Sequence, residues 1–212
     1  MLNIFLSGGP VMYPLLACSI ISLTVVIERL IFWITLNRRR NRQLLDEIMA
    51  LCESGDWEAV RRETAGSKDP IIKILISGIL HRRYSMIKAM EASAADEIKR
   101  MRRFMNVLDT MITVAPLLGI LGTVTGIIQS FDVLGTSGIE HPEIVTAGIA
   151  QALITTAAGL GIAILTVFPY NYFNSLVEDA AIQIEKYATS LEIVYERLIQ
   201  MNPTVEGREN EN

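Results

Sequence analysis

The sequence predicts an all-α membrane protein with three transmembrane helices, and two observations support this prediction. Half of the 212 residues are hydrophobic and the mean hydropathy is +0.35, which is high for a water-soluble domain of this length. The hydrophobic residues gather in three blocks, residues 11–36, 107–131 and 144–170. Each block has about 25 residues, enough to cross a hydrocarbon core about 30 Å thick as a helix.

Basic residues flank these blocks on one side only. Four arginines lie between residues 38 and 42, and four Lys or Arg residues lie between 99 and 103, whereas residues 1–10 and 132–143 contain none. The positive-inside rule therefore places the N-terminus and the short link outside and the other polar segments in the cytoplasm. The predicted segments are an outer N-terminus (1–10), span one (11–36), a cytoplasmic helical loop (37–106), span two (107–131), an outer link (132–143), span three (144–170), a cytoplasmic helical extension (171–200) and a disordered tail (201–212).

The inner end of span one carries two charged residues, Glu28 and Arg29. Arg29 can extend its guanidinium toward the cytoplasmic face. Glu28 has two interpretations. It is either an intramembrane acid or, as we favour, a structural residue that pairs with a basic neighbour or lies at shallow depth.

The sequence of the cytoplasmic loop predicts short amphipathic helices. Such helices are typical of a helical collar next to the membrane and not of a catalytic domain. Apolar residues between Leu44 and Leu51 share one helical face, and Gly55 ends that pattern. Asp56 is the predicted N-cap of a second helix. Asp69 is the predicted N-cap of a third, with Pro70 at its first position.

Two long helices are predicted to continue the spans into the cytoplasm. One runs unbroken from Ser85 into span two, with an apolar stripe of Ile87, Met90, Ala94, Ile98, Met101, Met105 and Leu108. The other follows span three and has a heptad seam of Phe173, Val177, Ala180, Ile184, Tyr187, Leu191, Val194 and Leu198. The two extensions pack on each other within one subunit or also line the wall of an oligomer, and the pattern is compatible with both.

Span two has features of a closely packed helix. Pro116 favours a kink, and Gly119, Gly122 and Gly126 place small residues on one face at spacings of three and four. Thr123 lies between these glycines.

Span three presents a matching surface of small and hydroxylated residues. Gln151, Thr155 and Gly159 lie four residues apart, and Thr156 belongs to the neighbouring stripe. The threonine hydroxyls either bond back to carbonyls of their own helix or face a neighbour. Gln151 has two donors and an acceptor to satisfy, so its amide is expected to face protein or water and not lipid.

These two spans resemble a known signature. APLLGILGTVTGIIQSF (residues 115–131) and GIAQALITTAAGLGIAILTVFPYN (residues 148–171) are similar to segments of the ExbB/TolQ/MotA family, the channel-forming halves of ion-driven motors in bacterial inner membranes. The three-span layout with a long cytoplasmic loop resembles ExbB and TolQ more than MotA. The resemblance implies that the outer segments are periplasmic.

The resemblance also implies partners and an ion pathway. Such proteins form a pentamer whose second and third spans surround the single helices of a dimeric ExbD/TolR-like partner. Protons pass between an aspartate of that partner and polar residues of the pentamer wall, and a TonB- or TolA-like protein relays the movement. The family's wall threonines correspond to Thr123 and Thr156. We expect Thr156 to face the central lumen and Thr155 to lie at a subunit seam.

One position departs from the family pattern. The proton-pathway Glu of the GIAEAL motif in ExbB and TolQ is Gln151 in this chain. An amide does not titrate. Either the partner's aspartate carries the titration alone, or this chain couples differently, for example to sodium through hydroxyl and carbonyl oxygens. A scaffold that clamps a partner helix without conducting ions is the alternative function.

An enzymatic function has almost no support. His81 and His141 are predicted on opposite sides of the membrane, and the sequence contains no nucleophile–base pair or metal-ligand cluster. No cofactor and no metal are expected. The basic residues are ordinary flanks of membrane spans, so nucleic acid is not an expected partner, whereas membrane lipid is.

Overall fold

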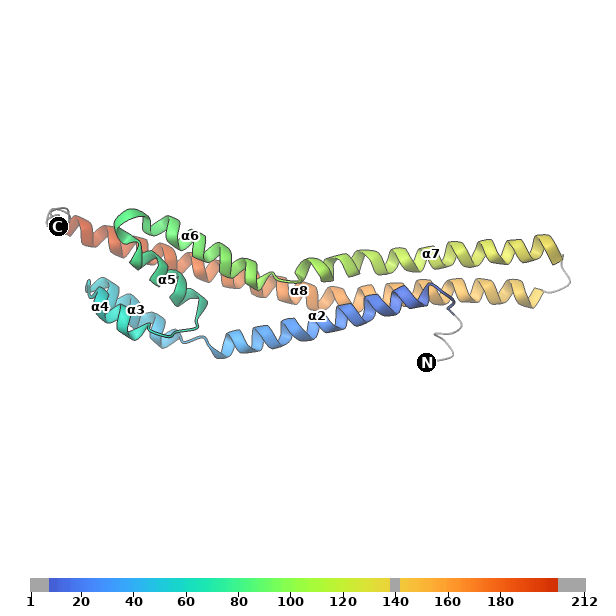
Figure 1. The fold of residues 1–212 in the computed structure, drawn as a ribbon, viewed down its shortest axis with the longest axis horizontal. Helices are drawn as coiled ribbons and strands as arrows, with labels where there is room; N and C mark the ends of the chain where they lie inside the picture. Colours follow the sequence, from blue (N-terminus) through green and yellow to red (C-terminus); the bar gives the residue numbers. More distant parts are fainter. Residues whose placement is uncertain (1–7, 138–141, 202–212) are drawn as a thin grey trace. The chain divides into compact units, whose positions relative to one another are not determined.

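The computed structural model describes residues 8–137 and 142–201, and the regular structure in those ranges is α-helical throughout, as predicted (Figure 1). The helices there are α2 (Met12–Arg38), α3 (Arg42–Glu53), α4 (Trp57–Glu63), α5 (Pro70–Leu80), α6 (Arg82–Met101), α7 (Met105–Ser137) and α8 (Pro142–Met201). Residues 1–7 of the predicted N-terminus, 138–141 of the outer link and 202–212 of the predicted tail lie outside the described residues. The rest of the predicted link is helical, at the end of α7 and the start of α8.

Three of these helices are long and apolar enough to cross a membrane: α2, α7 and α8. Their length and composition support a multi-pass membrane protein. The helices extend beyond the predicted spans, because α7 continues to Ser137 and α8 begins at Pro142. The third span and its cytoplasmic extension form one continuous helix of 60 residues.

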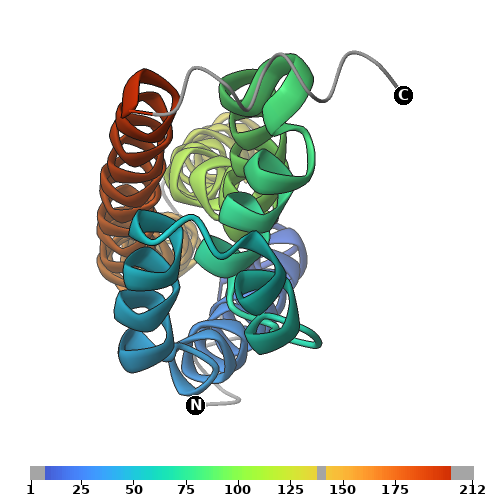
Figure 2. The ribbon, with the colours of Figure 1, turned by 90° about the vertical axis from the view of Figure 1, so that its left-hand side faces the viewer.

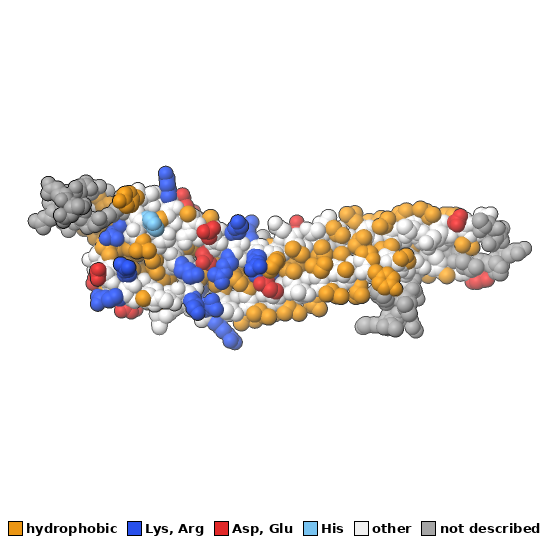
Figure 3. Space-filling view, viewed as in Figure 1, with side chains coloured by type: hydrophobic (Ala, Val, Ile, Leu, Met, Phe, Trp, Pro, Cys, Tyr) orange, Lys and Arg blue, Asp and Glu red, His pale blue; other side chains and the backbone are white. Residues whose placement is uncertain are grey.

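The chain divides into two compact units. The span unit comprises Met1–Ile31 and Phe104–Asn174, and the loop unit comprises Phe32–Arg103 and Ser175–Asn212. Both α2 and α8 contribute residues to each unit. Hydrophobic side chains cover much of the visible surface of the span unit, whereas Lys and Arg side chains gather on the loop unit (Figure 3).

In the span unit, the first half of α2 packs against α7 and α8. Met12, Leu15 and Cys18 of α2 form a buried cluster with Ala115 of α7. Partly buried residues of α7 and α8 surround this cluster: Met111, Val114, Leu118, Ala158 and Ile162. Most of the remaining apolar side chains of the spans are exposed, as expected of helices in contact with lipid.

The loop unit has a larger apolar core. The helices α3 to α6 and the C-terminal part of α8 lie around it, as the view in Figure 2 shows. Its fully buried side chains include Leu45, Ile48, Ile72, Leu75 and Leu191. The predicted face of α3 is confirmed, because Leu45 and Ile48 are buried in this core and the other members of the face pack against it.

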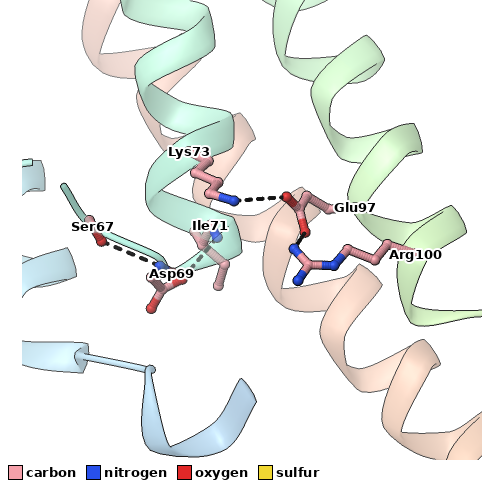
Figure 4. Close-up of polar contacts among 6 residues, drawn as sticks. All are labelled: Ser67, Asp69, Ile71, Lys73, Glu97 and Arg100. Carbon is pink, nitrogen blue, oxygen red and sulfur yellow. Dashed lines mark hydrogen bonds and ion pairs between the residues drawn. The ribbon is translucent and has the colours of Figure 1, made fainter. Parts of the chain in front are cut away.

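The predicted helix caps are also confirmed. The Asp56 carboxylate accepts a hydrogen bond of 2.9 Å from the Ala59 N–H at the start of α4. The buried Asp69 carboxylate accepts one of 2.9 Å from the Ile71 N–H at the start of α5 (Figure 4). Each side chain satisfies one of the backbone donors that a helix start leaves unpaired.

One ion-pair group joins α5 and α6. The Glu97 carboxylate lies 3.4 Å from the Lys73 ammonium and 3.6 Å from the Arg100 guanidinium (Figure 4). Lys73 and Arg100 are solvent-exposed, so each pair contributes about 1 kcal/mol or less to stability.

The heptad seam of α8 is confirmed as a buried face within one chain. Phe173, Val177, Ile184 and Leu191 are buried. Ala180, Tyr187 and Val194 pack against the core of the loop unit. The heptad seam of α8 therefore packs within the chain, as the first of the two interpretations predicts.

The prediction of an unbroken helix from Ser85 into span two is wrong at two places. Residues 102–104 form a turn between α6 and α7, in which Phe104 has the left-handed φ of 64°. Ser85 has a non-helical backbone, although the predicted stripe is kept from Met90 onward, where Met90, Met101, Met105 and Leu108 are buried. Met86 is buried in place of the predicted Ile87, which is 44% exposed.

Candidate functional site

The candidate site is the contact between α7 and α8 in the span unit, where glycines let the two backbones approach each other (Figure 1). A Cβ atom added to Gly119 would lie 3.0 Å from the Cα atom of Thr156. One added to Gly126 would lie 3.0 Å from the Cβ atom of Ala152. The glycines predicted to pack therefore form the α7 side of this contact.

Gly159 is the small residue that α8 contributes to this contact. A Cβ atom there would meet the carbonyl oxygen of Ala115 and lie 3.1 Å from the Cα atom of Gly119. Both are backbone atoms and have no rotamer by which to move away. Pro116 follows directly in α7, which continues through it as a helix, although proline cannot donate a hydrogen bond to the carbonyl four residues before it.

Two threonine hydroxyls meet across the contact. The Thr123 and Thr156 hydroxyls are hydrogen-bonded to each other. The Thr156 hydroxyl also lies 3.0 Å from the Gly119 carbonyl oxygen, which is 3.2 Å from the Thr123 hydroxyl. The Ala152 carbonyl oxygen is a third neighbour, 3.4 Å from the Thr123 hydroxyl. Both threonine residues are partly buried.

Thr155 has a different environment, although it is next to Thr156. Its hydroxyl donates to the Ala152 carbonyl of its own helix at 2.8 Å. Its side chain is 1% exposed and lies against Gly122, where an added Cβ atom would be 2.7 Å from the Thr155 Cβ. The Thr155 hydroxyl is therefore bonded to a carbonyl of its own helix, which is the first of the two interpretations of the threonines. The Thr155 side chain lies between α7 and α8 of the same chain.

Gln151 lies on the opposite edge of the buried face of α8 from Thr156. Five residues separate the two, which at about 100° per residue turns their side chains about 140° apart around the helix. Gln151 is partly buried and meets the backbone of Gly9, just before α2. The structure therefore brings Thr123 and Thr156 together and does not bring Gln151 to them.

The charged pair in α2 has a structural arrangement. The Glu28 carboxylate lies 2.5 Å from Arg29 Nε and 2.7 Å from Arg29 Nη2. Arg29 is 1% exposed, and its guanidinium lies over the Phe104 ring, 5.8 Å from the centroid. The pairing predicted for Glu28 is confirmed, but Arg29 is buried against protein and does not extend to solvent.

Some residues of this contact were missed by sequence reasoning. Ser130 is buried, donates to the Gly126 carbonyl at 2.9 Å and faces Gly148 closely enough to exclude a Cβ atom there. Ser130 could have been predicted, because it lies four residues after Gly126 and so continues the small-residue face of α7.

The contact of Gly8 and Gly9 with α8 could not be predicted from a local pattern, because it joins residues about 140 positions apart. Within the described residues, no group of three or more His, Cys, Asp or Glu side chains could hold a metal ion.

The sequence is similar to a known protein family and to several of its members. Residues 67–186 match the sequence profile of the MotA/TolQ/ExbB proton channel family. The chain is 32% identical over 197 residues to the biopolymer transport protein ExbB-like 3 of Synechocystis sp., covering 91% of this chain and 93% of that protein. It is 36% identical over 203 residues to ExbB-like 1 of the same organism, covering 92% and 79%. The Tol-Pal system protein TolQ of Haemophilus influenzae is 34% identical over 109 residues, covering 50% and 48%.

Proposed function

Because the chain belongs to the MotA/TolQ/ExbB proton channel family, we propose that it is the channel-forming subunit of an ion-driven motor in a bacterial inner membrane. It would assemble as a homo-oligomer, a pentamer by family resemblance, around the single-span helices of an ExbD/TolR-like partner. A TonB- or TolA-like protein would relay the resulting movement to transport or envelope processes.

The hydroxyl pair of Thr123 and Thr156 is the observation that carries this proposal. A helix in lipid gains close packing from glycines alone, but this contact also holds two hydroxyls, from partly buried residues, against two carbonyl oxygens. Each hydroxyl both donates and accepts, so the pair can hydrogen-bond a carboxylate or a water in the lumen and pass a proton along the bond. Neither hydroxyl titrates near neutral pH, so the titrating group would be the partner's aspartate.

The other predicted pathway residues have lesser roles in this proposal. Thr155 is assigned to helix packing, because its hydroxyl is bonded within α8 and its side chain is buried. Gln151 would act through hydrogen bonding and not through titration, because an amide carries no exchangeable charge.

The test replaces the hydroxyls without changing the side-chain shape. The double variant Thr123→Val/Thr156→Val should lose partner-dependent function and still assemble. Thr125→Val is the matched control, because the Thr125 hydroxyl bonds only to carbonyls of its own helix, at 3.0 and 3.1 Å. Full function in the double variant would refute the role of the hydroxyl pair, and equal loss in the control would show that the effect is not specific to it.

Gln151→Ala provides the second test, and this variant should keep substantial activity. A loss as severe as that caused by removing the partner's aspartate would contradict the proposed role of Gln151. Activity can be followed as growth that depends on the energised process, with membrane abundance of the protein as the control.

The second candidate function is a scaffold that clamps a partner helix without conducting ions. Gln151 favours it, because the family's acid is missing at that position. Reconstituted complex distinguishes the two. A response to a pH gradient or to sodium supports the motor, and sodium dependence would fit the cluster of hydroxyl and carbonyl oxygens. No response to either ion would support the scaffold.

A further inference from the structure

The segment just before α2 lies directly on α8. A Cβ atom added to Gly9 would fall on the Gln151 side chain, 2.8 Å from Cδ and 3.5 Å from Cγ. One added to Gly8 would lie 3.5 Å from the Cγ2 atom of Ile154. Gly8 is buried, and Gly9 is partly buried. The bare backbone of these glycines therefore contacts the turn of α8 that carries Gln151.

Gly9 meets two separate requirements. Its φ of +68° is in the left-handed region that favours glycine. In addition, the space where its side chain would be is filled by the Gln151 amide. Gly55 has a similar φ of +75° but nothing within 4 Å of an added Cβ atom. Gly55 therefore meets only the backbone requirement and provides a matched control.

The contact continues into the start of α2. The Met12 N–H donates to the Gly9 carbonyl at 3.1 Å, closing a turn at the start of the helix. Met12, Leu15 and Cys18 then pack in the cluster that includes Ala158 and Ile162 of α8. The contact at Gln151 is thus the outermost of a series that joins α2 to α8.

We propose that Gln151 is a positioning residue that seats the N-terminal segment Gly8–Met12 on α8 and thereby holds the start of the first span. A neutral amide suits this position, because it can present a donor or an acceptor to a backbone segment without placing a charge in a partly buried site. This role concerns packing within one chain and does not depend on the proposed ion pathway.

A cross-link within the chain tests the contact. Gly8→Cys/Ile154→Cys is made in a chain with Cys18→Ala. Cys52 is kept, because it is buried and its thiol has a pKa raised to about 12, so it reacts slowly. Mild oxidation of the full-length protein in membranes should join residues 8 and 154 in good yield. The control Gly8→Cys/Leu153→Cys should give about tenfold less, because residue 153 is turned about 100° away on α8. Equal yields, or cross-links only between two chains, would overturn the proposal.

Substitutions at Gly9 and Gln151 then test the role of the amide. Gly9→Ala should lower the cross-link yield by about tenfold, whereas Gly55→Ala should leave it unchanged. Gln151→Ala alone should lower the yield several-fold, because it removes the side chain that seats the segment. Adding Gly9→Ala to Gln151→Ala should then cost less than Gly9→Ala does in the parent chain, because the side chain that the new methyl group meets is gone. An unchanged yield in Gln151→Ala, or no effect of Gly9→Ala, would overturn the proposal. These readouts are independent of motor activity, so they remain informative if the ion-driven function is wrong.

Discussion

Three threonines in the span unit show how position around a helix decides what a hydroxyl does. Thr155 and Thr156 are sequence neighbours, but about 100° of helical rotation separates them. The Thr155 hydroxyl is bonded to its own helix and buried, whereas the Thr156 hydroxyl reaches α7 and meets Thr123. Thr155 is therefore bonded within α8, whereas Thr156 joins α8 to α7.

Cys52 supplies a residue-scale prediction. Its side chain is 0% exposed, and burial, with a smaller contribution from Glu53, raises the pKa of its thiol from 9.0 to about 12. A raised folded-state pKa contributes stability that is complete below pH 9 and is lost as pH rises toward 12. At a pH of about 10.5 the loss is on the order of 2 kcal/mol.

The measurement is the urea midpoint of the detergent-solubilised protein at pH 8 and at a pH of about 10.5. The wild-type chain should lose more stability between these values than Cys52→Ala, which lacks the thiol and controls for other groups that titrate. An equal loss in both chains would contradict the prediction.

At the scale of elements, α8 and α7 owe their close contact to a few positions where a methyl group does not fit. Gly159→Ala would drive its Cβ atom into the backbone of Ala115 and Gly119. We expect a cost of about 1–3 kcal/mol, typical of overpacking. Gly161→Ala is the control, since nothing lies within 4 Å of an added Cβ atom there. Thermal unfolding of both variants in detergent checks this, and similar melting temperatures would contradict it.

The caps of the loop unit provide a second element-scale prediction. The Asp69 carboxylate caps α5, also accepts a hydrogen bond of 3.3 Å from the Asn41 N–H at the start of α3, and is 1% exposed. Asp69→Ala should therefore cost about 2 kcal/mol or more, because it leaves buried donors unpaired.

The exposed cap Asp56 serves as the comparison, and Asp56→Ala should cost about 1 kcal/mol. Asp69→Asn keeps one of the two acceptor oxygens and should recover only part of the loss, because its NH2 group faces the other N–H donor. Denaturant titration of the three variants checks this order. A cost at Asp69 no larger than that at Asp56 would contradict the importance of burial.

Across the whole molecule, the features that could be predicted are those carried by local pattern. The three spans follow from hydropathy, the caps at Asp56 and Asp69 from short motifs, and the buried face of α8 from heptad spacing. The turn at residues 102–104 could not be predicted, because Phe104 adopts a left-handed conformation without a glycine or proline to signal it. The sequence predicts matching small-residue faces on α7 and α8, but it does not predict that the Thr123 and Thr156 hydroxyls contact each other.

The contact of Gly9 with Gln151 had no local signal either. Sequence spacing gives the direction of a side chain on its own helix, but not which distant segment it meets. Gln151 was therefore placed with the threonines by motif, whereas packing turns it toward the start of the first span.

Membrane orientation is the prediction that involves the whole chain. With three spans we expect the termini on opposite sides of the membrane, and the asymmetry of Lys and Arg predicts that the loop unit lies in the cytoplasm. In a chain with Cys18→Ala, single cysteines are introduced at Gly135, near the end of α7, and at Glu63, at the end of α4. A membrane-impermeant maleimide added to spheroplasts should label Gly135→Cys at once and Glu63→Cys only after permeabilisation. The native Cys52 is the internal control, since its burial and raised pKa should keep it unlabelled until the protein unfolds. Labelling of Glu63→Cys in intact spheroplasts would contradict the predicted orientation and would place the loop unit outside the cytoplasm.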